Sequence, residues 1–224
     1  MGLRYEKFTQ GVGAMIVLTA LTGAIPPGLR HARWDFEADE PGKIAIGFTN
    51  AEGRWLVAKD GDNLVLAQRA ENRTEVCNVT LIEQTSYKDV DLRVRIKALA
   101  GENEQGGGLI WRAKDKENYY AASYNPYTNR YKPRPPNVRL CKVENGKLTQ
   151  LDQAEVPGDK EWHTLRITME GSEIVGYLDD RKLLEAEDST FLDVGKIGLW
   201  SKSDAQSYFD DLEVSTYQAP KDPK

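Results

Sequence analysis

Alternation of apolar and charged residues is the feature that most limits how this chain can fold. In VDLRVRIKAL (90–99), Leu92, Val94, Ile96 and Ala98 face one way, and Arg93, Arg95 and Lys97 face the other. Successive side chains of a β-strand point to opposite faces of the sheet. The pattern therefore predicts a strand in a sheet that is buried on one side and wet on the other, as in antiparallel sheets.

Similar short runs recur along the chain, and turn residues separate them. We expect further strands at 63–68, 76–82, 107–114, 118–125, 137–145, 163–170, 173–180, 196–202 and 207–214. Gly, Asn and Asp stand between several of these runs, where hairpins need them. No long amphipathic helix is expected. The sequence predicts an all-β fold, a two-sheet antiparallel β-sandwich of jelly-roll type.

Size and charge exclude several classes of protein. The chain has 224 residues and a net charge of −5, which suits one domain and provides no basic stripe for nucleic acid. His31 and His163 are the only histidines, so no His-based zinc cluster is expected. The only two cysteines are Cys77 and Cys141, and both a disulfide and a pair of buried free thiols remain open.

The N-terminus has the pattern of a signal peptide at 1–24. Arg4 and Lys7 precede the uncharged apolar run 12–25, and small residues at 22–24 suit cleavage. An uncleaved anchor is the alternative. We therefore expect a secreted or periplasmic protein without a membrane span after cleavage. A linker at 25–33, one domain at 34–217 and a flexible tail at 218–224 would follow.

Several segments, in their order along the chain, resemble a known fold family. They include GLIWRAKD and NYY within 106–126, WHTLR within 161–171, and GLWSK and FDDLEV within 195–214. Together they resemble the concanavalin A-like, laminin G-like sandwiches of bacterial exported proteins, and are similar to the branch grouped with 3-keto-disaccharide hydrolase-like domains. The resemblance implies a jelly roll with one concave face, on which relatives bind glycans.

The sequence departs from the enzymes of this fold at two places. Enzymatic members of the branch tend to carry a Glu-x-Gln-hydrophobic-hydrophobic-Asp stretch where this chain has YYAASYNPY (119–127), which holds no carboxylate. The laminarinase-like members use Glu-x-Asp-x-x-Glu to supply paired acids for hydrolysis, and that spacing is absent from the sequence. Glycan binding is therefore better supported than hydrolysis.

Aromatic and polar residues of 111–139 and 199–204 are candidates for a carbohydrate site. The predicted sugar-binding residues are Trp111, Arg112, Tyr120, Tyr124, Asn125, Tyr127, Arg139, Trp200, Lys202 and Asp204. The rings would stack on the apolar faces of sugars, and the polar groups would bond the hydroxyls. The alternative is that the aromatic residues are strand formers buried against the second sheet. Prolines within 131–139 predict a rigid rim loop, either a groove wall or a stiff connection.

Two adjacent aspartates stand in the last expected strand. Alternation puts Asp210 on the face of Leu212, and an aspartate among packed residues should be paired or bound to a cation. Many sandwiches that resemble this one hold a structural Ca²⁺ near the last strand, which here would involve Asp210, Gly61 and Asp35. Capping of the turn, or pairing with a nearby Arg or Lys, is the alternative.

The predicted function is that of an exported module that binds carbohydrate on one sheet face. A hydrolase or lyase acting on keto-disaccharides is the alternative, with acids from scattered positions such as Asp115, Glu117 and Asp204. His163 could then serve as a general base, although a structural role suits its place at a strand start better. A structural or protein-interaction module is the third possibility.

Overall fold

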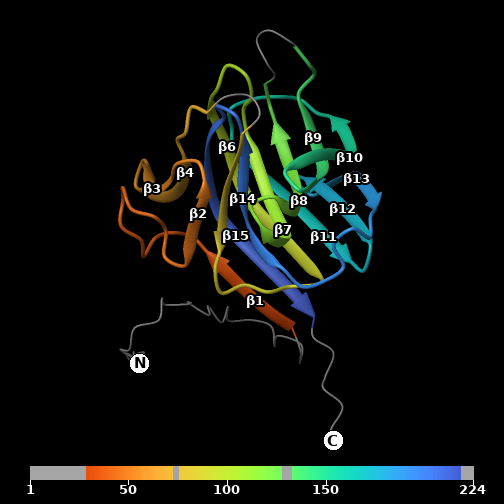
Figure 1. Ribbon diagram of the computed structural model, residues 1–224. Helices are drawn as coiled ribbons and strands as arrows, with labels where there is room; N and C mark the ends of the chain where they lie inside the picture. The colour runs from red at the N-terminus through yellow and green to blue at the C-terminus, as the bar shows by residue number, and fades with distance from the viewer. Residues whose placement is uncertain (1–28, 73–75, 128–132, 218–224) are drawn as a thin grey trace, which may run out of the picture.

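The computed structural model describes residues 29–72, 76–127 and 133–217, and these form a sandwich of two β-sheets (Figure 1). The strands are β1 (Leu29–Trp34), β2 (Phe48–Glu52), β3 (Trp55–Asp60), β4 (Asn63–Gln68), β5 (Cys77–Ile82), β6 (Val90–Ala100), β7 (Gly107–Asp115), β8 (Asn118–Asn125), β9 (Asn137–Glu144), β10 (Lys147–Glu155), β11 (His163–Glu170), β12 (Glu173–Leu178), β13 (Arg181–Glu187), β14 (Lys196–Lys202) and β15 (Gln206–Tyr217). Among these residues, no helix is long and apolar enough to cross a membrane.

Every strand pairing is antiparallel. One sheet has eight strands, in the order β13-β12-β11-β6-β15-β4-β3, with β1 also paired to β15. The other has seven strands, in the order β10-β9-β8-β7-β14-β5-β2. The prediction of a two-sheet antiparallel jelly-roll sandwich is confirmed. The first and last strands lie side by side, so the two ends of the domain meet in one sheet (Figure 1).

The structure contains five strands that the sequence pattern did not predict: β1, β2, β3, β10 and β13. The expected linker at 25–33 is wrong from Leu29 onward, because Leu29–Trp34 pairs with β15 over its whole length. Within β1 only Ala32 is buried among the residues whose side chains are described. Trp34 is partly buried against the core, and two inward positions in six residues give too weak an alternation to identify from sequence.

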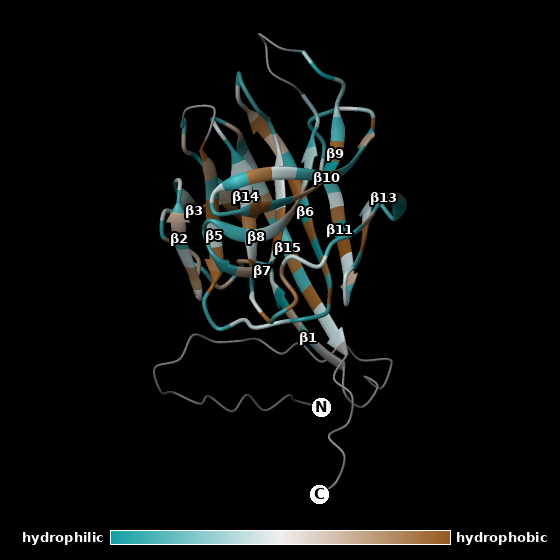
Figure 2. Ribbon diagram, turned by 45° about the vertical axis from the view of Figure 1, so that its right-hand side comes forward, coloured by the Kyte–Doolittle hydropathy of each residue, from teal (hydrophilic) through white to brown (hydrophobic). Residues whose placement is uncertain are grey.

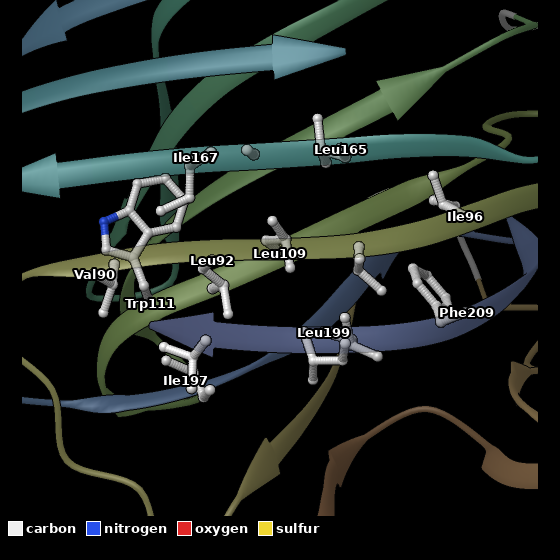
Figure 3. Packing of buried hydrophobic residues seen from close by; sticks show 14 of the residues in the cluster. Val90, Leu92, Ile96, Leu109, Trp111, Leu165, Ile167, Ile197, Leu199 and Phe209 are labelled. Carbon is white, nitrogen blue, oxygen red and sulfur yellow. The ribbon is translucent and has the colours of Figure 1, made fainter. Parts of the chain in front are cut away.

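The main hydrophobic core fills the space between the two sheets. Figure 3 shows Leu92 and Ile96 of β6 and Leu165 of β11 facing Leu109 of β7 and Leu199 of β14. All five side chains are fully buried. The alternation of apolar and polar positions that predicted these strands is visible along β11 and β15 (Figure 2). The outer faces of the two sheets therefore remain as the surfaces that a ligand could reach.

The paired aspartates mark the point where β15 changes neighbours. Ser207–Phe209 pairs with β4, whereas residues from Leu212 onward pair with β1. Opposite β6 the register shifts between Asp210 and Glu213, and Asp211 has a left-handed φ of 49°. Such a bulge lets one strand bend from one partner to the next. The Asp-Asp pair therefore serves the fold, since aspartate tolerates the left-handed conformation better than most residues.

Candidate functional site

A groove lies on the outer face of the eight-stranded sheet. We call it the ion-pair groove; it has a volume of about 270 Å³ and is lined by His31, Asp91, Arg93, Arg166, Asp180, Glu213 and Ser215. A second hollow of about 110 Å³ adjoins it, with Arg93 and Glu213 in both linings and Arg95, Thr164 and Asp211 at its far side. The two hollows share part of their lining along the central strands of this sheet, and we refer to them together as the channel.

Strand register places the lining residues in two cross-strand rows. Glu213 of β15, Arg93 of β6, Arg166 of β11 and Tyr177 of β12 are successive Cα partners. The next row holds His31, Ser215 and Asp91. Side chains in such rows share one face of the sheet, so the alternation that buries Leu92 and Val94 also presents Asp91, Arg93 and Arg95 to the groove. The floor of the groove is thus built from paired strands, not loops.

Two arginines face each other in the middle of the groove, and a carboxylate compensates each one. Nε and Nη2 of Arg166 donate to the two carboxylate oxygens of Asp91 at 2.7 and 2.6 Å. Nε and Nη2 of Arg93 donate to Oε2 of Glu213 at 3.0 and 2.5 Å. Like charges directly opposite each other are destabilising unless they are compensated. The hydrogen bond to Asp91 is the main reason why the pKa of Arg166 is raised.

Aromatic rings support the guanidinium groups at both ends of the channel. The guanidinium of Arg166 lies 4.9 Å from the ring centroid of Tyr177, and that of Arg95 lies 4.9 Å from the ring of Trp162. Planar stacking of this kind restricts an arginine side chain. On the opposite wall, Nδ1 of His31 lies 3.1 Å from Oγ of Ser215. The groove therefore presents fixed donors and acceptors.

Sequence reasoning did not identify this groove, although part of its signal is visible in the sequence. The alternation of 90–99 predicts only that its charged side chains lie on the solvent-exposed face of a strand. Their partners come from segments 75 or more positions away: Arg166 pairs with Asp91, and Glu213 with Arg93. Alternation predicts that these charges face outward, but the register between distant strands, which brings them together, is not encoded in any local motif.

The predicted aromatic platform is wrong for the rings that the structure describes on the inner face of β7 and β8. Trp111, Tyr120 and Tyr124 are fully buried and belong to the core between the sheets. Figure 3 shows Trp111 pointing into this core. The hydroxyl of Tyr120 donates to Asp188 at 2.6 Å, and burial raises the pKa of Tyr120 to about 12. None of these rings can lie flat on a sugar.

Arg112 is also buried, and its guanidinium joins three loops. It donates to the carbonyl oxygens of Lys88 (2.6 Å), Phe191 (2.8 Å) and Gly171 (2.7 Å), and to Asp89 at 3.2 Å. The residue has a left-handed φ of 47° at a bulge of β7. This bulge inverts the alternation, which is why a residue expected to bond a sugar is instead an internal structural link.

The outer face of the seven-stranded sheet brings together several other predicted residues, but most of them are covered. Trp200 is 4% exposed; it is the partner of Gly108 and reaches across β7 to donate from Nε1 to the carbonyl of Ala122 at 3.0 Å. With Tyr119, Ile110 and Val143, among others, it forms a second, smaller apolar cluster. This face is therefore filled by the protein's own side chains.

The polar candidates on the same face differ in how far they are buried. Asn125 is buried and donates to Ser123 and Asn137 at 3.0 and 3.1 Å. Arg139 and Lys202 are half-buried, and among the hydrogen bonds of the described structure Nε of Arg139 has no partner.

Two further candidates lie beside this face. Tyr127 is 39% exposed. The carboxylate of Asp204 accepts hydrogen bonds from the backbone N–H groups of residues 102–104. Burial opposes ionisation of Asp204, but these bonds lower its pKa. Asp204 therefore holds a loop in place.

The predicted calcium position is occupied by protein donors. Asp210 accepts hydrogen bonds from Nδ2 of Asn63 at 2.9 Å and from the N–H of Asp211 at 2.7 Å. Asp35 accepts one from the N–H of Glu37. No group of three or more His, Cys, Asp or Glu side chains in the described ranges could hold a metal ion. Pairing, the alternative named for Asp210, is what the structure displays, and calcium stays a prediction.

His163 and the two cysteines take structural positions. Nδ1 of His163 lies 2.6 Å from Asp179 and Nε2 lies 2.8 Å from Asp159. Burial alone would lower the pKa of His163, but these two hydrogen bonds raise it above its usual 6.5. The imidazole thus clamps two loops with both nitrogens engaged. Cys77 and Cys141 are not joined in a disulfide, and burial raises the pKa of Cys141 to about 12.

Comparison with known proteins places the sandwich in a family. Residues 35–215 match the model of the 3-keto-alpha-glucoside-1,2-lyase-like domain. The chain belongs to this family. The sequence resemblance to 3-keto-disaccharide hydrolase-like domains is thereby confirmed.

A curated bacterial protein and several solved structures resemble this lyase-like domain. A levanase of Bacillus subtilis (strain 168) is 27% identical over 163 residues, which are 68% of this chain but only 20% of the levanase. The carbohydrate-binding module CBM66 from Bacillus subtilis has a TM-score of 0.63 and 25% identity, covering 77% of this chain and 96% of the module. Domain 4 of AbnA, an extracellular arabinanase from Geobacillus stearothermophilus, shares the fold with a TM-score of 0.53 at 11% identity, covering 83% of this chain and 91% of that domain.

Proposed function

We propose that this lyase-like domain is a carbohydrate-binding module that recognises a glycan without covalent chemistry. The observation that carries the proposal is the likeness to CBM66, which extends over 96% of that module at 25% identity. The levanase likeness supports it, because the shared segment is a fifth of that protein (20%). A segment of this size fits an accessory domain better than a whole enzyme.

The contacts within the ion-pair groove suit binding more than catalysis. Sugar hydroxyls both donate and accept hydrogen bonds, and the groove offers guanidinium donors beside carboxylate acceptors. A general acid or base needs a carboxyl group whose proton affinity is tuned near the working pH. Asp91 and Glu213 instead each accept hydrogen bonds from an arginine side chain. The N-terminal signal pattern supports export to the periplasm or the outside of the cell.

An enzyme acting on keto-disaccharides is the second candidate, because the family description names a lyase. Two of the three acids suggested by the sequence, and the histidine, are engaged in local structure. Asp115 accepts from the N–H of Glu117 and from the Asn118 side chain, Asp204 holds the 102–104 loop, and both nitrogens of His163 are engaged. Because these side chains already have structural hydrogen-bond partners, the structure favours binding over catalysis.

Two measurements on the same preparation test the proposal. Affinity electrophoresis against levan, arabinan, xylan and pectin, followed by isothermal titration with the matching oligosaccharides, should detect saturable binding. Incubation with glucosides and their 3-keto derivatives should release no product. Product release would favour the lyase, and binding to no member of the panel would contradict the module.

A further inference from the structure

We propose that the ion-pair groove on the eight-stranded sheet is the glycan site, and that it takes an uncharged sugar by bonding its hydroxyl groups. The inference rests on the proposed function and adds to it the sheet, the residues and the ligand class. The seven-stranded sheet, on which the sequence placed the site, would have no role in contact with the sugar.

The first step is that the groove is open while the opposite face is filled. The groove and its adjoining hollow have volumes of about 270 and 110 Å³, close to the lower end of the range of roughly 300–1,000 Å³ for small-molecule sites. On the seven-stranded sheet, Trp200 and Tyr119 occupy the corresponding space with 4% and 0% exposure. A sugar would have to displace packed side chains there, at a cost that the groove does not impose.

The second step is that the groove holds hydrogen-bonding capacity in fixed positions. A guanidinium carries five N–H groups, and the hydrogen bonds to Asp91 and Glu213 engage only Nε and Nη2 of Arg166 and of Arg93. The carboxylate oxygens of Asp91 and Glu213 retain further lone pairs. Since ion pairs and ring stacking already hold these side chains, a ligand would lose little entropy in ordering them.

The third step is that the groove carries no excess of positive charge. Both lining guanidiniums are already paired with carboxylates, so an anionic sugar would find no unpaired counter-ion among the described lining residues. Asp180 adds another carboxylate near Arg166. Hydroxyl groups, which can donate to Asp91 and accept from Arg166, fit such an array, whereas a uronate or sulfate would meet repulsion. The ligand class that follows is a neutral oligosaccharide.

Titration of groove variants tests the assignment. With neutral levan-, arabinan- and xylan-derived trisaccharides and trigalacturonate as probes, Arg166→Ala and Arg93→Ala should each weaken neutral-sugar binding about tenfold, as the loss of a charge-assisted hydrogen bond implies. Arg166→Lys should also weaken it, because lysine keeps the charge but not the planar fork. Lys182→Ala, which removes the surface ion pair with Glu185 on β13, is the matched control and should bind normally.

Each outcome decides between the two proposals. If the unmodified chain binds a neutral trisaccharide but the groove variants bind equally well, the groove is not the site and the module proposal survives. Loss of binding in Arg139→Ala and Lys202→Ala instead would move the site to the seven-stranded sheet. Binding of trigalacturonate alone would overturn the neutral class. Binding of no probe would remove the proposed function itself. Circular dichroism and melting of every variant check that the sandwich is folded.

Discussion

Replacement of Arg112 by methionine should destabilise the sandwich strongly although it touches neither groove nor surface. The substitution keeps most of the buried side-chain volume and removes the guanidinium, whose side chain is 0% exposed. Three carbonyl acceptors, those of Lys88, Phe191 and Gly171, then lose their donor. The side chain of Asp89 is 44% exposed, so loss of its ion pair with Arg112 adds little to the destabilisation.

The size of the effect follows from those three carbonyl groups. A buried acceptor left without a partner costs about 1–3 kcal/mol, and only the bond to Phe191 is wholly buried, so we expect a total loss of about 3–5 kcal/mol. Urea unfolding followed by tryptophan fluorescence measures it through the midpoint at unchanged m. Arg181→Met, an exposed arginine of β13, is the control and should stay within about 0.5 kcal/mol. A loss below about 1 kcal/mol for Arg112→Met would refute this account of the buried arginine.

Further predictions concern the buried ion pair, the bulge, the imidazole clamp and the metal. Asp188→Asn should cost about 1.5–3 kcal/mol, because it removes the carboxylate partner of the part-buried Lys142, 2.6 Å away, and leaves only the bond to Oγ1 of Thr190; a loss near zero in urea unfolding would contradict this. Gly195→Ala should lower the melting temperature, since a Cβ there would lie 2.3 Å from the carbonyl carbon of Arg112. The raised pKa of His163 means that protonation stabilises the folded state. The unmodified chain should therefore have a higher free energy of unfolding than His163→Gln below about pH 6.5, and this difference should disappear as the pH rises through the folded-state pKa of His163. A difference that grows with pH would contradict this prediction. If the calcium site predicted from sequence is correct, EDTA should lower the melting temperature. An unchanged melting temperature would contradict this prediction.

The local sequence pattern predicts the two-sheet architecture, but it does not predict which faces of each strand are buried. Alternation in 90–99 predicts that Leu92 is buried and Arg93 is exposed. Both predictions are confirmed, because only one face of this strand packs against the second sheet. For β8 the same rule put Tyr120 and Tyr124 together, but it could not predict that Tyr119 on the other face is buried too. Tyr119 belongs to an outer apolar cluster with Trp200, which comes 81 positions later in the chain, so its burial depends on strands that are distant in sequence.

Bulges and long-range register explain the remaining errors. Arg112 sits where a bulge breaks the alternation of β7, so its direction could not be deduced from its neighbours. The groove requires Arg93 and Arg166 to be Cα partners, and a shift of one residue would turn one of them into the core. The sequence thus contains the charged side chains of the candidate site, while their assembly depends on the tertiary pairing of β6, β11 and β15.

Chemical-shift mapping tests the central claim most directly. The ¹⁵N-labelled chain would be titrated with the neutral trisaccharide that binds it best, and backbone amide shifts would be followed to saturation. The account predicts that the largest changes fall on β6, β11 and β15, around Asp91, Arg166 and Glu213. Changes confined to β7, β8, β9 and β14 would contradict it and would place the sugar on the opposite sheet.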